Sequence, residues 1–301
     1  LPSMLRLCFA ALASAAVAAP PRARRLSHTL EGPFEGAGQL LLHEARRAST
    51  GEWSGHRLWP ATPALLEHLH RTHSGGLHGL RVLELGCGLP LLSAALAALG
   101  AEVCATEHPE ALALAEHALV SSLEGLAPAA RARLKLRALA WGQQAAQNLS
   151  ELCAFTQPVD LVLGADLIYH DFPLEPLRET LLGVLRAYDA VAVLALQPRG
   201  FPMSAALKDP HRVASFLRNL TEMGTWDIIL DQPGVDIAKT FRLEEIKGMT
   251  LATISPRGAR PRTAATSSKL RPLRYSRKEV PDDTEDGENN GTRRLAPSIE
   301  L

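Results

Sequence analysis

Residues 82–88 read Val-Leu-Glu-Leu-Gly-Cys-Gly, which places an acid and two glycines around the end of a short apolar run. Gly86 and Gly88 let the backbone turn sharply and approach a ligand closely. In an open α/β sheet, ligands bind at the carboxyl ends of the strands, where this turn is expected. A dinucleotide fingerprint would need a third glycine at position 91, which is Leu91. Glu84 instead favours a ligand with a free amino group, although an ordinary strand-to-helix turn remains the alternative.

A second acid ends the next apolar run. Glu107 closes residues 102–107, about 20 residues after the glycine turn. A carboxylate at that place accepts hydrogen bonds from ribose hydroxyls. Glu107 could also be a favourable charge at the start of the following helix. Together with the glycine turn, it favours a ribose-binding role.

The third feature is a pair of polar residues that follows an apolar run at residues 159–165. Asp166 and Tyr169 form an Asp-x-x-Tyr sequence directly after it. An acid and a phenol at the carboxyl end of a strand would face the same crevice as Glu84 and Glu107. A helix cap beside a core tyrosine is the alternative interpretation.

These residues need a parallel sheet to bring them together, and the hydrophobic pattern predicts one. Short apolar runs alternate with stretches of helical periodicity, which indicates βαβ units with helices on both faces of the sheet. We expect strands at residues 81–85, 102–107, 134–140, 159–165, 190–196, 227–230 and 249–254, and helices at residues 60–71, 91–99, 109–123, 145–152, 173–185 and 210–223.

Four landmarks at residues 55–61, 84–88, 140–142 and 166–169 resemble those of the seven-β-strand protein-lysine methyltransferases of the methyltransferase-like group. The resemblance runs over residues 55–254 and implies a Rossmann-like class I fold and S-adenosylmethionine as methyl donor, with no metal. It also implies a protein substrate. It places Asp166 and Tyr169 in catalysis, and with the motifs above it gives the cofactor-binding residues as Trp59, Glu84, Gly86, Cys87, Gly88, Glu107, Trp141 and Ala165.

The chain departs from this family at three positions. Pro90 and Ser93 stand where the family usually has glycines, and Ala140 replaces an acid that would bind the adenine amino group. Two alternatives therefore stay open. The enzyme could methylate another nucleophile, such as histidine, arginine or a small metabolite, or the chain could be an inert methyltransferase fold used as a binding module.

Composition sets the remaining expectations. Lys plus Arg and Asp plus Glu both number 32, so the basic excess of a broad nucleic-acid binder is missing. The four cysteines show no metal-binding spacing, and we expect them to be free, buried thiols. We also expect the protein to be a monomer.

Both ends of the chain differ from its middle. Residues 1–30 resemble a signal or organelle-targeting segment without a membrane span, residues 31–256 form the methyltransferase domain, and residues 257–301 read as a disordered tail. Three of the four asparagines, Asn148, Asn219 and Asn290, lie in Asn-x-Ser/Thr sequons, which keeps the secretory route open. An intracellular location is favoured, because S-adenosylmethionine is made and used mainly inside cells.

Overall fold

The computed structural model gives a seven-stranded sheet, a second sheet of three strands and seven helices among the residues it describes. The described residues are 25–32, 39–45, 57–73, 76–123, 126–143, 145, 147, 149–168, 173–198, 211–233, 246–258 and 274–280.

The strands of the main sheet lie close to the apolar runs of the sequence. Each is short, and its side chains alternate between the two faces. They are β3 (Arg81–Glu84), β4 (Glu102–Glu107), β5 (Leu134–Ala138), β6 (Leu161–Ala165), β7 (Val191–Leu196), β8 (Trp226–Asp231) and β9 (Thr250–Pro256).

Six of the seven described helices overlap the predicted ones, and the short α4 was not predicted. They are α1 (Ala61–Thr72), α2 (Leu91–Ala98), α3 (Leu112–Leu123), α4 (Pro128–Ala132), α5 (Leu149–Cys153), α6 (Leu174–Tyr188) and α7 (Arg212–Glu222).

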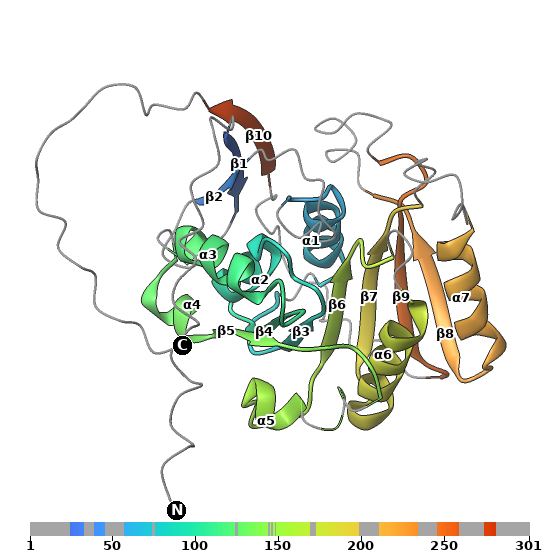
Figure 1. Cartoon of the computed structure of the whole chain (residues 1–301). Coiled ribbons are helices and arrows are strands. Elements are labelled where there is room, and N and C mark those ends of the chain that lie inside the picture. Colours follow the sequence, from blue (N-terminus) through green and yellow to red (C-terminus); the bar gives the residue numbers. More distant parts are fainter. Residues whose placement is uncertain are drawn as a thin grey trace, which may run out of the picture.

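The strand order of the main sheet is β5-β4-β3-β6-β7-β9-β8 (Figure 1). The first five strands in this order pair in parallel, and β9 pairs antiparallel with both β7 and β8. The mostly parallel, Rossmann-like sheet that the sequence predicts is therefore confirmed. The chain leaves β3 toward β4 and β5 on one side, while β6 and β7 lie on the other. This switch point between β3 and β6 is where such sheets bind ligands.

Helices cover both faces of the sheet, as expected. Val82 of β3 packs in a core with α1 and α2, whereas its neighbour Leu83 packs with α5, α6 and α7 on the opposite face. In α6 the buried Leu177, Leu181 and Leu185 recur every four residues, which gives the helix one apolar side.

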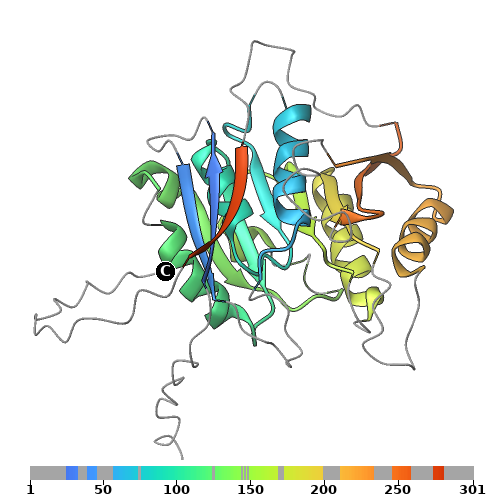
Figure 2. The same ribbon diagram turned by 90° about the horizontal axis from the view of Figure 1, so that it is seen from above.

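Three further strands form a separate small sheet that the sequence did not predict. They are β1 (Arg25–Glu31), β2 (Gln39–Ala45) and β10 (Arg274–Val280), in the antiparallel order β10-β1-β2 (Figure 2). Leu30, Leu40 and Leu42 of this sheet are buried in the same core as α1 and α2.

This small sheet extends beyond both ends of the expected domain of residues 31–256. β1 overlaps the expected targeting segment of residues 1–30, and residues 274–280 within the tail expected to be disordered form β10. These residues pair along their whole length with β1, from Arg25 opposite Val280 to Glu31 opposite Arg274. The rest of these two segments, namely residues 1–24, 259–273 and 281–301, lies outside the described part of the chain.

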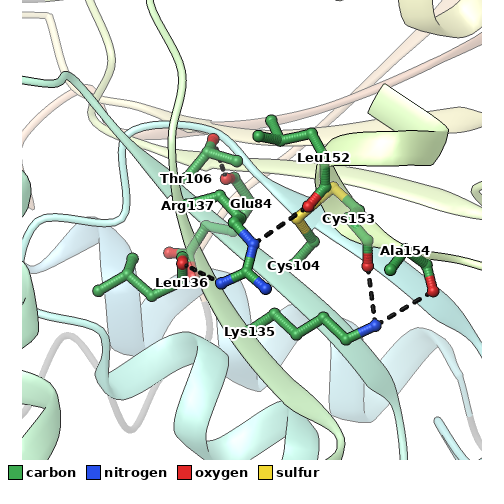
Figure 3. The surroundings of a disulfide bond; sticks show 9 residues. All are labelled: Glu84, Cys104, Thr106, Lys135, Leu136, Arg137, Leu152, Cys153 and Ala154. Atoms are coloured by element: carbon green, nitrogen blue, oxygen red, sulfur yellow. Dashed lines mark hydrogen bonds between the residues drawn. A yellow bond between two sulfur atoms is a disulfide. The ribbon is translucent and has the colours of Figure 1, made fainter. Parts of the chain in front are cut away.

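The cysteines also differ from expectation. Cys104 of β4 and Cys153 at the end of α5 form a disulfide, with their Cα atoms 5.5 Å apart, so the prediction of free thiols is wrong for this pair (Figure 3). Lys135 and Arg137 of β5 also connect to the end of α5, because they donate hydrogen bonds to the main-chain oxygens of residues 152–154. Cys87 is a free, buried thiol.

Candidate active site

A cavity of about 290 Å³ opens at the carboxyl ends of β3, β4 and β6, next to the switch point of the sheet. Its size is at the lower end of the range for small-molecule sites. Eight of the ten residues selected from the sequence line it: Trp59, Gly86, Cys87, Gly88, Glu107, Trp141, Ala165 and Asp166. Of the other two, Glu84 is buried and is not among the lining residues, and Tyr169 is outside the described residues.

The glycine turn after β3 forms the floor of the cavity. Gly86 and Gly88 have φ angles of +59° and +52°, in the left-handed region that favours glycine. A Cβ atom on Gly86 would lie 2.9 Å from Cδ2 of Leu167 and 3.3 Å from Cζ2 of Trp141. The turn therefore needs glycine at position 86 for its backbone conformation and for the space beside Trp141.

Glu107 holds this turn in place. Its Oε2 accepts a hydrogen bond from the backbone N–H of Gly88, and its Oε1 accepts one from that of His108, both at 2.7 Å. An ionised carboxylate offers about four lone-pair positions. Glu107 can therefore keep both backbone contacts and still accept hydrogen bonds from ligand hydroxyls.

Glu84 occupies a buried position under the turn. It is 2% exposed and accepts a hydrogen bond from the hydroxyl of Ser93 in α2. Burial raises the pKa of Glu84 to about 8; nearby Glu107 adds to this rise, and the Ser93 hydrogen bond opposes it. A cation close to Glu84 would stabilise the ionised carboxylate and lower this pKa.

The departures from the family at positions 90 and 93 are accommodated in α2. Pro90 directly precedes the helix, and its carbonyl accepts the N–H of Ala94 at 3.0 Å. Ser93 supplies the hydroxyl that Glu84 accepts. The third departure, Ala140, lines the cavity beside Trp141 without supplying a polar group.

Asp166 follows β6 in an unusual backbone conformation. Its φ is +61°, which is uncommon for any residue other than glycine, and its side chain is 6% exposed. The backbone N–H of Asp166 donates to the carbonyl of Ala195 in β7 at 2.8 Å. This bond fixes the strained residue at the cavity, and such strain is found most often at functional sites.

The segment before α1 closes another side of the cavity. Trp59 and Arg57 both line it, with the guanidinium of Arg57 4.9 Å from the centroid of the Trp59 ring. Sequence reasoning selected Trp59 from its motif but missed Arg57. It also missed further lining residues: Thr62, Leu89, His108, Ala111, Leu139, Leu167, Pro173 and Pro176.

Residues 40–221 match the lysine methyltransferase family, and the chain belongs to it. It is 32% identical to mouse EEF1A lysine methyltransferase 3 over 43% of this chain and 49% of that protein. It is 35% identical to mouse protein N-lysine methyltransferase METTL21A over 41% of this chain and 52% of that protein. The chain thus spans about half the length of these two relatives.

A solved structure of the glycopeptide N-methyltransferase MtfA complexed with sinefungin is 17% identical to the chain, with a TM-score of 0.45. It covers 69% of this chain and 90% of that one. The described residues contain no helix long and apolar enough to cross a bilayer. They also contain no cluster of three or more His, Cys, Asp or Glu side chains suited to a metal.

Proposed function

We propose that this protein transfers a methyl group from S-adenosylmethionine to the amine of a lysine side chain in a protein. The observation that carries the proposal is the convergence of separate sequence motifs on one cavity at the switch point of the sheet. The glycine turn, Glu107, Trp141 and Asp166 come from four different connections of the chain and line the same space.

The residues around the cavity fit the methyl donor. Glu107 would accept hydrogen bonds from the ribose hydroxyls. The Trp59 ring would line the cofactor, and the Trp141 ring would pack on its adenine. Glu84 would supply the negative charge for the amino group of the cofactor. Ala165, at the end of β6, would lie beside the cofactor.

When bound, S-adenosylmethionine supplies a methyl group that the positive charge of its sulfonium already activates. The residues of this chain then have to position a neutral amine and exclude water. Neutralising a lysine of pKa near 10.4 at pH 7 costs about 4.6 kcal/mol. Apolar walls such as Leu139, Leu167 and Pro176 reduce this cost, because they disfavour the ammonium form.

Asp166 would accept a hydrogen bond from the amine and aim its lone pair at the methyl carbon. The hydroxyl of Tyr169 would assist in holding the amine. A new N–C bond forms as the S–C bond breaks, and the amine loses a proton. Water as well as Asp166 can take this proton, so Asp166 acts chiefly by orienting the amine.

Isothermal titration with S-adenosylmethionine tests the cofactor site. We expect binding by the wild-type chain and weaker binding by Glu107→Ala, since hydrogen bonds to a charged group contribute about 1.5–3 kcal/mol. Equal affinities of the wild-type chain and Glu107→Ala would show that Glu107 does not contact the cofactor. The absence of binding would instead favour an inert binding protein, the alternative that Ala140 in the cavity supports.

Incubation with methyl-labelled cofactor and a cell lysate, followed by analysis of the labelled residues, tests the acceptor. Label on lysine supports the proposal. Label on histidine, arginine or a small metabolite would assign another nucleophile.

We also propose that the protein acts as a monomer inside cells, where its methyl donor is made. Two observations favour the secretory route instead. Disulfides persist mainly in oxidising compartments, and Asn219 of the sequon in α7 is exposed. Glycosidase treatment and thiol alkylation of protein isolated from cells separate the two routes. A glycan on Asn219 with an intact disulfide would overturn the intracellular proposal.

A further inference from the structure

The small sheet contains a buried chain of polar side chains. Nε2 of His28 in β1 lies 2.8 Å from Oε2 of Glu44 in β2, and its Nδ1 lies 2.7 Å from the hydroxyl of Tyr275 in β10. His28 is 0% exposed and Glu44 is 3% exposed. Because an ionised carboxylate only accepts hydrogen bonds, Nε2 of His28 carries the hydrogen and donates a hydrogen bond to Glu44. In a neutral imidazole, Nδ1 then accepts from the Tyr275 hydroxyl.

Glu44 extends this chain to the wall of the cofactor cavity. Its Oε2 also accepts the backbone N–H of Leu58 at 2.9 Å, and its Oε1 lies 3.8 Å from Nε of Arg57. Arg57 in turn packs over the ring of Trp59. One carboxylate therefore connects the small sheet to the segment of residues 57–59, and Arg57 and Trp59 line the cavity.

A purely structural role would explain this arrangement poorly. Burying a charged or polar pair costs desolvation energy, and apolar side chains of similar volume often stabilise a fold as well or better. Hydrogen bonds, unlike apolar contacts, fix direction. Here a hydrogen bond to Glu44 holds the backbone of Leu58, and an ion pair with Glu44 orients the guanidinium of Arg57; these two residues precede Trp59.

We propose that Tyr275, His28 and Glu44 are positioning residues for cofactor binding, through which strand β10 sets the position of Trp59 at the cofactor cavity. The inference rests on the proposed function, since it takes this cavity as the site of S-adenosylmethionine. It assigns a role in the active site to Tyr275, which is separated from its partner His28 by 247 positions in the sequence.

Tyr275→Phe in the full chain tests the proposal, because it keeps the ring and removes only the hydroxyl. The matched control is Ser276→Ala, a change at the neighbouring exposed residue of the same strand. One readout is the dissociation constant of S-adenosylmethionine. A second is the fluorine resonance of Trp59 in protein labelled with 5-fluorotryptophan, assigned by its loss in Trp59→Phe.

We expect Tyr275→Phe to shift the Trp59 resonance and weaken cofactor binding roughly three- to tenfold, the effect of losing one hydrogen bond. Turnover at saturating cofactor should stay within about twofold, because the bond acts on binding. Ser276→Ala should change none of these. Glu44→Gln should shift the resonance further, because it also weakens the contact with Arg57.

Two results would overturn the proposal. In the first, Tyr275→Phe lowers the melting temperature while the Trp59 resonance and cofactor affinity stay at wild-type values, which is the outcome of a structural role alone. In the second, Ser276→Ala shifts the resonance as much as Tyr275→Phe. Failure of the proposed function looks different. Trp59→Ala would then bind the cofactor as wild type does, whatever the Trp59 resonance of Tyr275→Phe shows.

Discussion

Glu84 accepts a hydrogen bond from Ser93 at a position that is 2% exposed, two residues before Gly86 of the turn that lines the cavity. A carboxyl group so enclosed is protonated over much of the physiological pH range, because burial raises its pKa to about 8. A positively charged ligand at the cavity would favour its ionised form. Ligand binding and the loss of this proton are therefore coupled.

The first prediction follows from this coupling. The dissociation constant of S-adenosylmethionine should fall as the pH rises from 6.5 toward 8, and level off above it, because Glu84 then no longer has to lose a proton on binding. Glu84→Gln should bind more weakly and flatten this dependence. Titration calorimetry in buffers of different ionisation enthalpy measures the released proton. An unchanged pH profile in Glu84→Gln would show that Glu84 does not interact with the ligand.

The same carboxyl group should affect stability in the opposite direction. Its pKa is higher in the folded protein than in the unfolded chain. It therefore stabilises the fold fully below the unfolded value of about 4.3, and this contribution is lost as the pH rises toward 8. We expect the melting temperature of Glu84→Gln, relative to wild type, to improve between pH 6 and pH 8.5. A constant difference across this range would contradict the raised pKa.

Gly86→Val should weaken cofactor binding by roughly tenfold or more. The side chain would enter the space beside Leu167 and Trp141, and the φ of +59° strains a β-branched residue by more than the 1–2 kcal/mol or so that an ordinary residue loses there. Gly224→Val is the matched control. Gly224 has a similar φ of +69° but nothing within 4 Å of its Cβ position, and it lies in the turn before β8. The Gly224→Val variant should be less stable than wild type but bind the cofactor with wild-type affinity. Equal losses of affinity in both variants would mean that strain alone is responsible.

Asp166→Ala should lower turnover roughly 10- to 150-fold, which corresponds to the loss of one charge-assisted hydrogen bond of about 1.5–3 kcal/mol. Cofactor affinity should change little, because the proposed contact is with the amine. Asp166→Asn is the control: it keeps an acceptor oxygen and a side chain that tolerates the positive φ. We expect it to retain part of the activity. Normal turnover in Asp166→Ala would leave the helix cap as the better interpretation of Asp166.

Cys153→Ser should lower the free energy of unfolding by about 2–4 kcal/mol, because the disulfide closes a loop with a sequence separation of 49. Thermal melts with and without reductant measure this effect. Reductant should lower the melting temperature of the wild type toward that of Cys153→Ser and leave the variant unchanged. If reductant does not change the wild-type melt, Cys104 and Cys153 are not bonded in the isolated protein.

A chain ending at residue 256 should bind the cofactor more weakly than one ending at residue 280. The shorter chain lacks β10 and with it the Tyr275 hydroxyl that holds His28. The longer chain keeps both and should match the full chain in melting temperature and affinity. Equal affinity of the two truncated chains would mean that the end of the domain expected from the sequence, at residue 256, is adequate for cofactor binding.

The sequence predicted the centre of the main sheet well, because β3, β4, β6 and β7 are largely apolar runs with consecutive buried residues. Residues 102–107 read as a strand without regard to their partners, and β4 has these bounds. The strand β10 reads Arg-Tyr-Ser-Arg-Lys-Glu-Val, with little apolar character. Its conformation comes from pairing with β1, which lies at the other end of the chain. No local pattern contains that information.

The site was predictable where a motif fixes a residue near the end of a strand, as for Gly86, Glu107 and Asp166. Arg57 lies within the landmark of residues 55–61 but follows no strand of the main sheet, and its contacts with Trp59 and with Glu44 of β2 are visible only in the structure. The burial of Glu84 could not be inferred from the sequence either. A carboxyl group beside a glycine turn reads as a ligand contact, and only the packing of α2 shows that Ser93 encloses it. The disulfide depends in the same way on the approach of α5 to β4.

The pairing of β1 with β10 has a consequence for biosynthesis. Ribosomes release the chain from its N-terminus, so β1 and β2 emerge long before their third strand is translated. Until then β1 exposes an unpaired edge, which is a template for pairing with other chains. Long-range strand pairing of this kind is also slow to form. The nascent protein therefore has to keep this edge from aggregating throughout the synthesis of the main sheet, and a chaperone that binds extended segments would shield it during that interval.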